Sequence, residues 1–269
     1  MPSEGSLRLG ILGTGLIGAS IGLRARALGY HVVAVDRSPV NLRLALERGA
    51  VDEAVDALDG RELDLLVLAT PLDVTLALVR RFAADPPRAR LILDVASVKA
   101  PVVEAAAGLA GFVGTHPIAG GENSGPADAR ADLFSGAYWA YDPAAFAPAR
   151  AEAVAFIERL GARPVPIEPG LHDRTVALTS HLPQLLATVL AAQVGERLGR
   201  PPTAELCGSG LASMTRLGAS SWEVWGSIFS ENAAPIAQEI RSIAAILSKL
   251  AADLEEGRAD RLAPAFATS

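Results

Sequence analysis

The sequence of 269 residues predicts an α/β protein, in which a doubly wound, mostly parallel sheet is followed by an all-α domain. Two observations support this prediction. Up to Pro169, short apolar runs alternate with helical patterns, which is typical of a parallel sheet with helices on both faces. After Gly170 no strand pattern remains. We therefore expect one domain over residues 1–169 and a helical domain over residues 170–269.

The elements of the first domain are predicted from hydrophobic periodicity. Short buried strands are expected at 7–12, 31–36, 63–70 and 89–96, and further extended segments within 111–117, 136–143 and 162–169. The helices that connect them are expected at 16–28, 39–48, 73–82, 100–108 and 149–160.

The second domain contains three long helical patterns, at 171–198, 204–217 and 222–254. Pro183 lies inside the first of them and predicts a kink, because proline cannot donate a helical hydrogen bond. These helices are apolar on several faces, more than one helical layer can hide. We therefore expect a homodimer that forms through the C-terminal helices.

Composition limits the partners of this protein. A formal charge of −6 disfavours nucleic acid and anionic membranes, and a small anionic substrate would need a local cationic pocket. Cys207 is the only cysteine, which favours a reducing cytoplasm over an oxidising compartment. The first residues carry no signal-peptide pattern, and no apolar run long enough to span a bilayer is apparent, so no membrane partner is expected.

The motif GTGLIG predicts a dinucleotide site, because it matches G-x-G-x-x-G and lies between a strand and a helix. Gly13 makes the tight turn, Gly15 lets the backbone approach a pyrophosphate, and Gly18 allows close packing of the helix. Leu16 and Ile17 open that helix, whose free N–H groups and positive dipole end suit the phosphates.

Two further strand ends complete the expected cofactor site. Asp36 ends the second strand, where its carboxylate can bind the ribose hydroxyls of NAD and repel a 2′-phosphate. Arg37, the next residue, could instead receive a 2′-phosphate, so NADP stays the less favoured alternative. Thr70 and Pro71 end the third strand and should border the cofactor, although Thr-Pro is also an ordinary strand-ending turn.

His116 is the leading candidate for proton transfer. It ends an expected strand and precedes a glycine-rich segment, and no cysteine or second histidine stands at metal-ligand spacing from it, so no metal is expected. An imidazole titrates close to neutral pH. Ser97 follows the fourth strand and could donate a hydrogen bond to the nicotinamide or the substrate, or cap the helix that begins near Ala100.

The other histidines have plainer interpretations. His31 begins the second strand and is expected to be structural, and His172 is expected to be a capping or surface residue near a helix start. His181 is either a satisfied core residue or a functional one. Arg216 shares the apolar stretch 206–230 with a single other charge, so it needs either an internal carboxylate or a bound one.

Taken together, these motifs resemble the prephenate/arogenate dehydrogenase family of tyrosine biosynthesis. The resemblance extends over about residues 8–250, and the motifs occur in the family's order: GTGLIGAS, ATPLD, DVASVK, THPIAGGENSG, HD…TSHLPQ and TRLGASSWEVWGSIFSEN. It implies a Rossmann domain followed by a helical dimerisation domain. It also implies an NAD-dependent enzyme that acts on a small anionic cyclohexadienyl substrate.

The resemblance also assigns roles to individual residues. His116 corresponds to the catalytic histidine, Ser97 to the serine that orients it, and Arg216 to the arginine that binds a substrate carboxylate. Further substrate-binding positions are implied at His181, Gln184, Ser124 and Trp225, the last of which matches a tryptophan near the dimer contact. Gln184 departs from the family pattern, because many members that use prephenate have histidine there.

The implied reaction is the oxidative decarboxylation of prephenate to 4-hydroxyphenylpyruvate, and arogenate is the alternative substrate. Two other interpretations stay open. A two-domain NAD-linked hydroxyacid dehydrogenase usually relies on a lysine of its helical domain, whereas Lys249 is the only lysine in this one and lies in the last helical pattern. An NAD-binding sensor would need the glycine motif but not His116 or Arg216.

Overall fold

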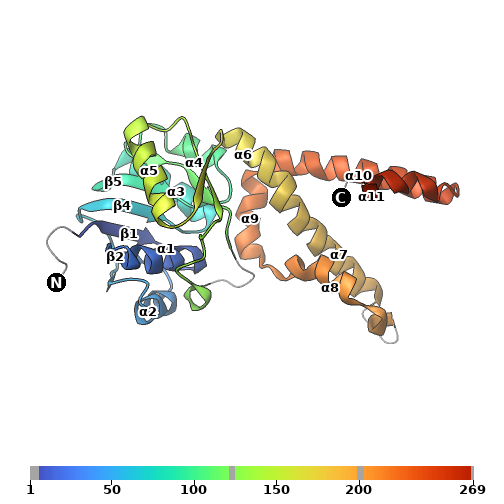
Figure 1. The fold of residues 1–269 in the computed structure, drawn as a ribbon, viewed down its shortest axis with the longest axis horizontal. Coiled ribbons are helices and arrows are strands. Elements are labelled where there is room, and N and C mark those ends of the chain that lie inside the picture. Colours follow the sequence, from blue (N-terminus) through green and yellow to red (C-terminus); the bar gives the residue numbers. More distant parts are fainter. Residues whose placement is uncertain (1–5, 121–124, 199–202, 268–269) are drawn as a thin grey trace. The chain divides into compact units, whose positions relative to one another are not determined.

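The structure is a computed structural model that describes residues 6–120, 125–198 and 203–267. The chain divides into two compact units (Figure 1). The first contains the residues up to Asp173 together with Ser220–Glu231, and the second contains Arg174–Ala219 and the residues from Asn232 onward. One helix of the C-terminal half therefore belongs to the first unit, and the boundary expected after residue 169 stays a prediction.

A six-stranded sheet forms the centre of the first unit, in the order β3-β2-β1-β4-β5-β6, and all of its strand pairs are parallel. After β3 the chain crosses back to place β4 on the other side of β1, so the direction of winding reverses between β1 and β4. Ligands of such sheets bind beyond the carboxyl ends of the strands at this point. The strands are β1 Arg8–Leu12, β2 His31–Val35, β3 Glu53–Ala54, β4 Leu63–Leu68, β5 Ala89–Asp94 and β6 Phe112–Val113.

Helices cover both faces of this sheet (Figure 1). They are α1 Leu16–Ala27, α2 Pro39–Glu47, α3 Leu72–Ala84, α4 Ala100–Ala105 and α5 Ala147–Arg159. Leu65 and Val67 of β4 join the core that contains α1 and α5, whereas Leu66 and Leu68 join the core that contains α3 and α4. Because strand side chains alternate between faces, both faces need apolar residues, and the predicted fold class is confirmed.

The next part of the chain forms a second sheet of three strands. They are β7 Thr115–Pro117, β8 Tyr138–Tyr141 and β9 Arg163–Pro166. β7 pairs antiparallel with β8, which pairs parallel with β9. The single extended segment expected over 111–117 is therefore wrong, because the chain changes sheet at Gly114. A Cβ at Gly114 would lie 2.6 Å from the Val103 side chain, so the crossing needs a glycine.

The C-terminal half is helical. It contains α6 Pro169–Val176, α7 Leu182–Leu198, α8 Ser209–Thr215, α9 Trp222–Glu231, α10 Ala233–Glu255 and α11 Ala263–Ala267. A π-helical turn over Ala177–His181 joins α6 to α7, directly before Pro183. Proline lacks the donor of a regular helical bond, so the expected kink takes the form of this wider turn. The single helix expected over 222–254 is wrong, because it breaks at Asn232.

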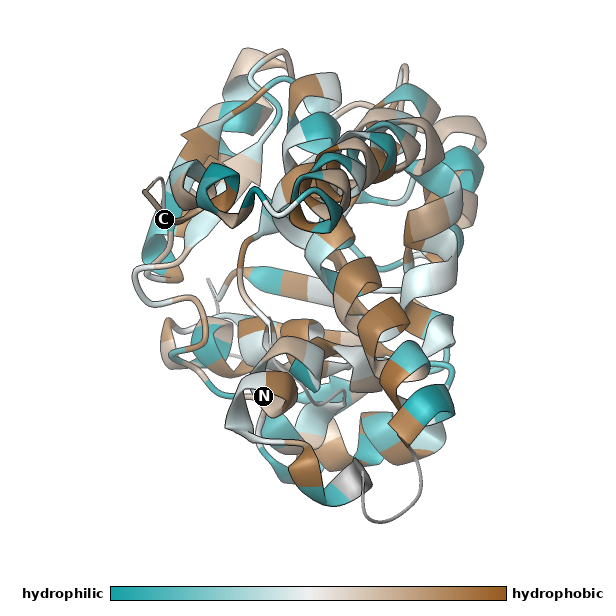
Figure 2. Ribbon diagram, turned by 90° about the vertical axis from the view of Figure 1, so that its right-hand side faces the viewer, coloured by the Kyte–Doolittle hydropathy of each residue, from teal (hydrophilic) through white to brown (hydrophobic). Residues whose placement is uncertain are grey.

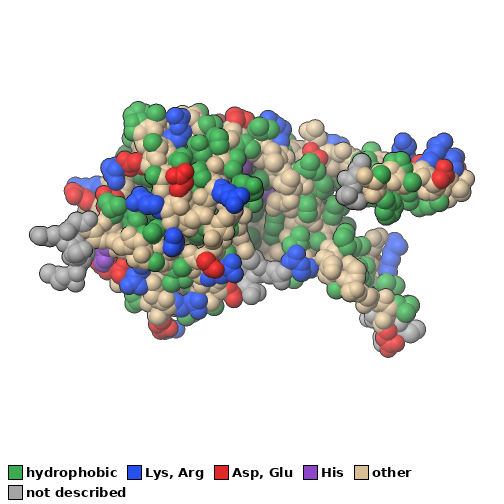
Figure 3. Space-filling model, in the orientation of Figure 1, with side chains coloured by type: hydrophobic (Ala, Val, Ile, Leu, Met, Phe, Trp, Pro, Cys, Tyr) green, Lys and Arg blue, Asp and Glu red, His purple; other side chains and the backbone are tan. Residues whose placement is uncertain are grey.

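Hydrophobic residues, coloured brown on the ribbon, recur along the helices that face the viewer in Figure 2. Contrary to the expectation from the sequence, the continuous helical run Pro169–Leu198 is long and apolar enough to span a bilayer by length and composition. A third of its most apolar window is buried in the structure, and core helices of soluble proteins pass the same test. On the face shown in Figure 3, charges of both signs are scattered over the first unit, and apolar surface is exposed on the C-terminal helices.

Candidate active site

The glycine motif forms the turn between β1 and α1. Gly13 has a φ of 95°, and a Cβ there would lie 2.4 Å from the carbonyl oxygen of Ala69. A Cβ on Gly18 would lie 2.0 Å from the carbonyl oxygen of Gly13, so α1 packs too close for a side chain. A Cβ on Gly15 would meet nothing within 4 Å, and no side chain caps α1.

Open space therefore lies in front of the first turn of α1, which begins with the half-buried Leu16 and Ile17. The N–H groups there have no side-chain acceptor from the cap residue, and the helix dipole is positive at this end. This arrangement fits a pyrophosphate group, as the motif predicts.

Asp36 is held rigidly next to this turn. Its Oδ2 accepts hydrogen bonds from the backbone N–H and the hydroxyl of Thr14, at 2.6 and 2.9 Å. Its Oδ1 accepts one from the backbone N–H of Ser38 at 2.8 Å. An ionised carboxylate oxygen can accept more than one hydrogen bond, so Oδ1 keeps capacity for a ribose hydroxyl. The adjacent Arg37 is exposed.

The end of β4 continues the same edge of the sheet. Thr70 is half-buried, and its hydroxyl lies 2.8 Å from the hydroxyl of Thr75. Pro71 is exposed and precedes α3 as its cap residue. The residues expected for the cofactor therefore all follow β1, β2 or β4, on the carboxyl side of the sheet.

His116 lies in β7, shortly beyond the carboxyl end of β6, and is half-buried. Its position is tied to the first sheet through the preceding residue. The backbone N–H of Thr115 donates to Asp94 Oδ1 at 2.9 Å, and the Thr115 hydroxyl donates to the backbone carbonyl of Asp94. Since Asp94 ends β5, His116 is anchored at the carboxyl edge of the parallel sheet, although it belongs to the other sheet.

The second histidine at this site was not expected. His172 is buried, and its Nε2 lies 3.0 Å from His116 Nδ1, while its Nδ1 lies 2.7 Å from Asp173 Oδ1. The expectation of a capping or surface residue is therefore wrong. A histidine beside an aspartate in the first turns of a helix gives no sign of burial by itself, because its partner, His116, is 56 residues away in the chain.

Asp173 is the residue that caps α4. Its Oδ1 accepts a hydrogen bond from the backbone N–H of Lys99, and its Oδ2 accepts one from that of Ala100, both at 2.7 Å. The expectation that Ser97 caps this helix is wrong, because a carboxylate from α6 occupies that place. Ser97 is half-buried and makes no hydrogen bond to another residue that the structure describes.

A buried ion pair joins the end of β5 to the start of α4. Lys99 Nζ contacts Asp94 Oδ2, and both side chains are almost fully buried. Burial lowers the pKa of the Lys99 ammonium, and the negative charge of Asp94 opposes that change. Asp94 also accepts hydrogen bonds from the backbone N–H groups of Ala96 and Thr115, so its charge is well compensated.

The remaining expected substrate residues fall in different places. In the second unit, His181 is buried with Nδ1 3.1 Å from Asn232 Nδ2, and buried Gln184 donates to the carbonyl oxygen of Leu217 at 2.7 Å. Arg216, next to Leu217, is exposed within this chain. In the first unit, Trp225 of α9 is half-buried and packs against the hydrophobic core that contains α3. Ser124 lies outside the described residues.

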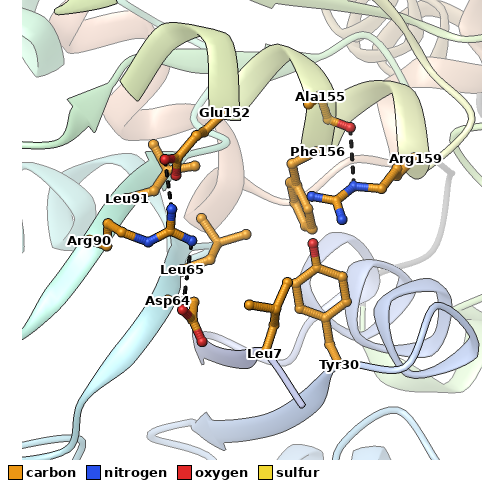
Figure 4. Close-up of a pocket in the computed structure, with 10 residues that line it drawn as sticks. All are labelled: Leu7, Tyr30, Asp64, Leu65, Arg90, Leu91, Glu152, Ala155, Phe156 and Arg159. Atoms are coloured by element: carbon orange, nitrogen blue, oxygen red, sulfur yellow. Dashed lines mark hydrogen bonds and ion pairs between the residues drawn. The ribbon is translucent and has the colours of Figure 1, made fainter. Parts of the chain in front are cut away.

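A cavity lies at the opposite edge of the sheet (Figure 4). It has a volume of about 180 Å³ and lies at the amino ends of β1, β4 and β5. Arg90 bridges Glu152 and Asp64 across it, at 2.6 and 3.6 Å. Burial raises the pKa of the Tyr30 hydroxyl, which Arg159 opposes. None of the described residues that are expected for the reaction lines this cavity, so we assign it no part in the chemistry.

Comparisons with known proteins identify the family of this chain. The sequence model of the nucleotide-binding domain of prephenate dehydrogenase matches residues 20–165, and that of the prephenate dehydrogenase dimerization domain matches residues 168–268. A probable prephenate dehydrogenase of Streptomyces niveus is 37% identical over 251 residues, which cover 89% of this chain and 67% of that protein.

Two other proteins are similar over nearly the whole chain. The cyclohexadienyl dehydrogenase of Zymomonas mobilis is 30% identical over 276 residues, which cover 97% of this chain and 93% of that protein. The crystal structure of a prephenate dehydrogenase from A. aeolicus, in complex with hydroxyphenyl propionate and NAD⁺, has a TM-score of 0.88. It covers 97% of this chain and 96% of its own, and at 23% identity this likeness shows the fold alone.

Proposed function

Because the chain belongs to the prephenate dehydrogenase family of NAD-dependent oxidoreductases, we propose that it converts prephenate to 4-hydroxyphenylpyruvate by oxidative decarboxylation, a step of tyrosine biosynthesis. One observation carries the proposal furthest. The His116 segment is anchored to the carboxyl end of β5, on the same side of the sheet as the glycine turn and Asp36. A base and a nucleotide site on one edge suit the oxidation of an alcohol.

In this reaction His116 acts as the general base. Bound NAD supplies the hydride acceptor. His116 takes the proton of the C4 hydroxyl as hydride leaves C4, so the carbinol carbon becomes a carbonyl carbon. The ring ketone then accepts the electron pair of the bond to the departing carboxylate, and carbon dioxide is released as the ring becomes aromatic. His116 then returns its proton to the phenolate oxygen, directly or through water, which gives the phenol of the product and restores neutral His116.

Binding and orientation are assigned to the other residues. Asp36 would accept a hydrogen bond from a ribose hydroxyl, which favours NAD over NADP because a 2′-phosphate would meet its negative charge. Arg216 would bind a substrate carboxylate through its guanidinium fork. Ser97 would donate to the substrate oxygen, and Ser124, His181, Gln184 and Trp225 are further proposed substrate contacts.

Arogenate is the second candidate substrate. Gln184 supports it, because many family members that use prephenate have histidine at this position. The similarity to a cyclohexadienyl dehydrogenase over 97% of this chain also supports it. Arogenate differs from prephenate in its side chain, an amino acid in place of a keto acid, so the ring chemistry at His116 would be the same.

We further propose that the enzyme is a cytoplasmic homodimer. The C-terminal match is to a dimerization domain, and α10 carries a stripe of apolar residues at the spacing of a coiled coil. The stripe consists of Ile240, Ile243, Leu247, Leu250 and Leu254, and three of these are exposed within this chain. A second copy would cover such a stripe.

The direct test is an assay of the purified protein with prephenate and with arogenate, each with NAD and with NADP, by the absorbance of the reduced nucleotide. We expect the highest kcat/KM with prephenate and NAD. Preference for arogenate would move the assignment to the second candidate. No reduction with any of the four pairs would refute the proposed function.

The base is tested by His116→Asn, with His31→Asn as the matched control. His31 lies at the start of β2, at the amino edge of the sheet, where its Nε2 is 2.8 Å from Glu53. We expect His116→Asn to lower kcat by about 10²- to 10⁴-fold, the usual contribution of general-base catalysis. His31→Asn should keep kcat near that of the unmodified protein. Equal activity of the two variants would contradict the assignment of His116.

A further inference from the structure

We propose that His172 and Asp173 are positioning residues, which fix the ring of His116 and determine which of its nitrogens accepts the proton. This inference rests on the proposed function of His116 as the base. It starts from an unbroken chain of contacts, from His116 Nδ1 to His172 Nε2 at 3.0 Å and from His172 Nδ1 to Asp173 Oδ1 at 2.7 Å.

Asp173, the last member of this series of contacts, determines which nitrogens of the two histidines carry protons. Asp173 accepts hydrogen bonds from the backbone N–H groups of Lys99 and Ala100 at the start of α4, one on each carboxylate oxygen. An ionised carboxylate can only accept hydrogen bonds, so His172 Nδ1 must carry a proton. In neutral His172 the other nitrogen, Nε2, is then an acceptor.

The same reasoning then applies to His116. Because His172 Nε2 accepts, His116 Nδ1 must donate, and neutral His116 carries its proton on Nδ1. Its Nε2 then carries the lone pair that a general base uses to accept a proton. Without this chain the two tautomers of His116 would compete, and one of them would place a hydrogen where the base needs a lone pair.

The contacts with His172 and Asp173 also stabilise His116 after it has gained a proton. When His116 gains a proton on Nε2, its positive charge donates through Nδ1 to His172, which is backed by the negative charge of Asp173. Among the described residues, the charged groups near the pair are Asp173 on α6, Asp94 at the end of β5, and Lys99 before α4. Lys99 and Asp94 form an ion pair with each other, so Asp173 is the carboxylate in direct contact with His172.

Burial and connectivity make the pair suited to positioning. Both side chains are almost fully buried, at 2% and 4% exposure, so water competes little for their hydrogen bonds. Asp173 is held by two backbone groups, and His172 directly precedes it in the same helix, so neither side chain can turn away easily. His116 is thereby supported by a rigid partner from a different segment of the chain.

The test compares two substitutions of His172, each of which retains one of its two contacts. His172→Asn places an amide N–H near the position of Nδ1, so the contact with Asp173 survives and the contact with His116 is lost. His172→Gln places an amide oxygen near the position of Nε2, so an acceptor for His116 survives. Both variants and His31→Asn are assayed as the full chain with prephenate and NAD across pH.

For His172→Asn we expect kcat to fall about 10- to 100-fold, as when an outer partner of a functional histidine is removed. KM should change little, and the acid limb of the kcat/KM profile should move to lower pH, because protonated His116 loses its acceptor. His172→Gln should restore part of kcat and of the limb position. The thermal unfolding midpoint and the affinity for NAD, measured without substrate, serve as structural readouts.

The outcomes separate this inference from the proposed function. If His116→Asn abolishes turnover while His172→Asn keeps kcat and an unmoved acid limb, the positioning role is wrong and the base assignment stands. Loss of kcat in parallel in both His172 variants, with an unmoved limb and a lowered unfolding midpoint, would show a purely structural role and also overturn it. Full activity of His116→Asn would refute the proposed base itself.

Discussion

Asp94 is the residue on which several parts of the site depend. It accepts hydrogen bonds from two backbone N–H groups, pairs with Lys99, and connects β5 to the strand that carries His116. Both members of the ion pair are almost fully buried. A buried pair gives little net stability against an apolar pair, but removal of one partner leaves an uncompensated charge. The pair therefore has to be retained or lost as a unit.

Lys99→Met should lower the free energy of unfolding by about 3–5 kcal/mol at neutral pH, because it leaves Asp94 buried without its cation. Urea denaturation measures the change. The matched control is Lys249→Met, since Lys249 is the only other lysine of the chain and is exposed. Its effect should stay within about 0.5 kcal/mol. If the two variants are equally stable, the Asp94–Lys99 pair does not have this role.

At the scale of the element, the turn between β1 and α1 shows two opposite uses of glycine. Gly18 is required by the fold, since a Cβ there would overlap the carbonyl oxygen of Gly13. Gly15 has an ordinary φ of −66° and open space around its Cα, so nothing in the fold requires a glycine there. The absence of a side chain at Gly15 is therefore explained by a ligand that approaches the backbone.

Gly15→Ala should weaken NAD binding by about tenfold or more, which corresponds to about 1.4 kcal/mol, and leave the unfolding midpoint nearly unchanged. Isothermal titration and thermal unfolding provide the two measurements. Gly195→Ala is the control, because Gly195 lies in α7 and a Cβ there would also meet nothing within 4 Å. It should leave NAD affinity unaltered. Unchanged affinity in Gly15→Ala would argue against a pyrophosphate at this turn.

At the scale of the whole molecule, the apolar residues lie in two kinds of environment. Those of the first unit form two cores, one on each face of the six-stranded sheet. Many of those in the second unit remain exposed within one chain, including Leu178, Val189, Ile246 and Leu247. Single exposed apolar residues are ordinary, but a repeated stripe along a 23-residue helix indicates a protein partner.

The proposed dimer predicts a mass of about twice 27.8 kDa in solution, measured by light scattering or sedimentation. Leu247→Glu, at the centre of the α10 stripe, should shift the protein toward the monomer, because it would bury a charge in the interface. Val40→Glu is the control, since Val40 is an exposed apolar residue of the first unit. It should keep the mass of the unmodified protein, and a dimeric Leu247→Glu would exclude α10 from the contact.

Much of this architecture could be predicted from local patterns. The strands that form the parallel sheet follow buried apolar runs, and the five predicted helices of the first domain appear within a few residues of their expected bounds. The two-residue strand β3 was not predicted, because so short a run has no periodicity. The change of sheet at Gly114 was also missed, because alternation does not tell a strand which sheet to join.

The sequence by itself determined the doubly wound fold, the glycine turn, the acid that follows β2, and the choice of His116 as the candidate base. These are properties of short segments, in which spacing and residue type carry the physics. Only the tertiary structure decided that His172 is buried against His116 and that Asp173, not Ser97, caps α4. Those contacts join residues 56 and more positions apart. A buried polar side chain is satisfied by whichever partner folding brings to it, and no local pattern records which one that is.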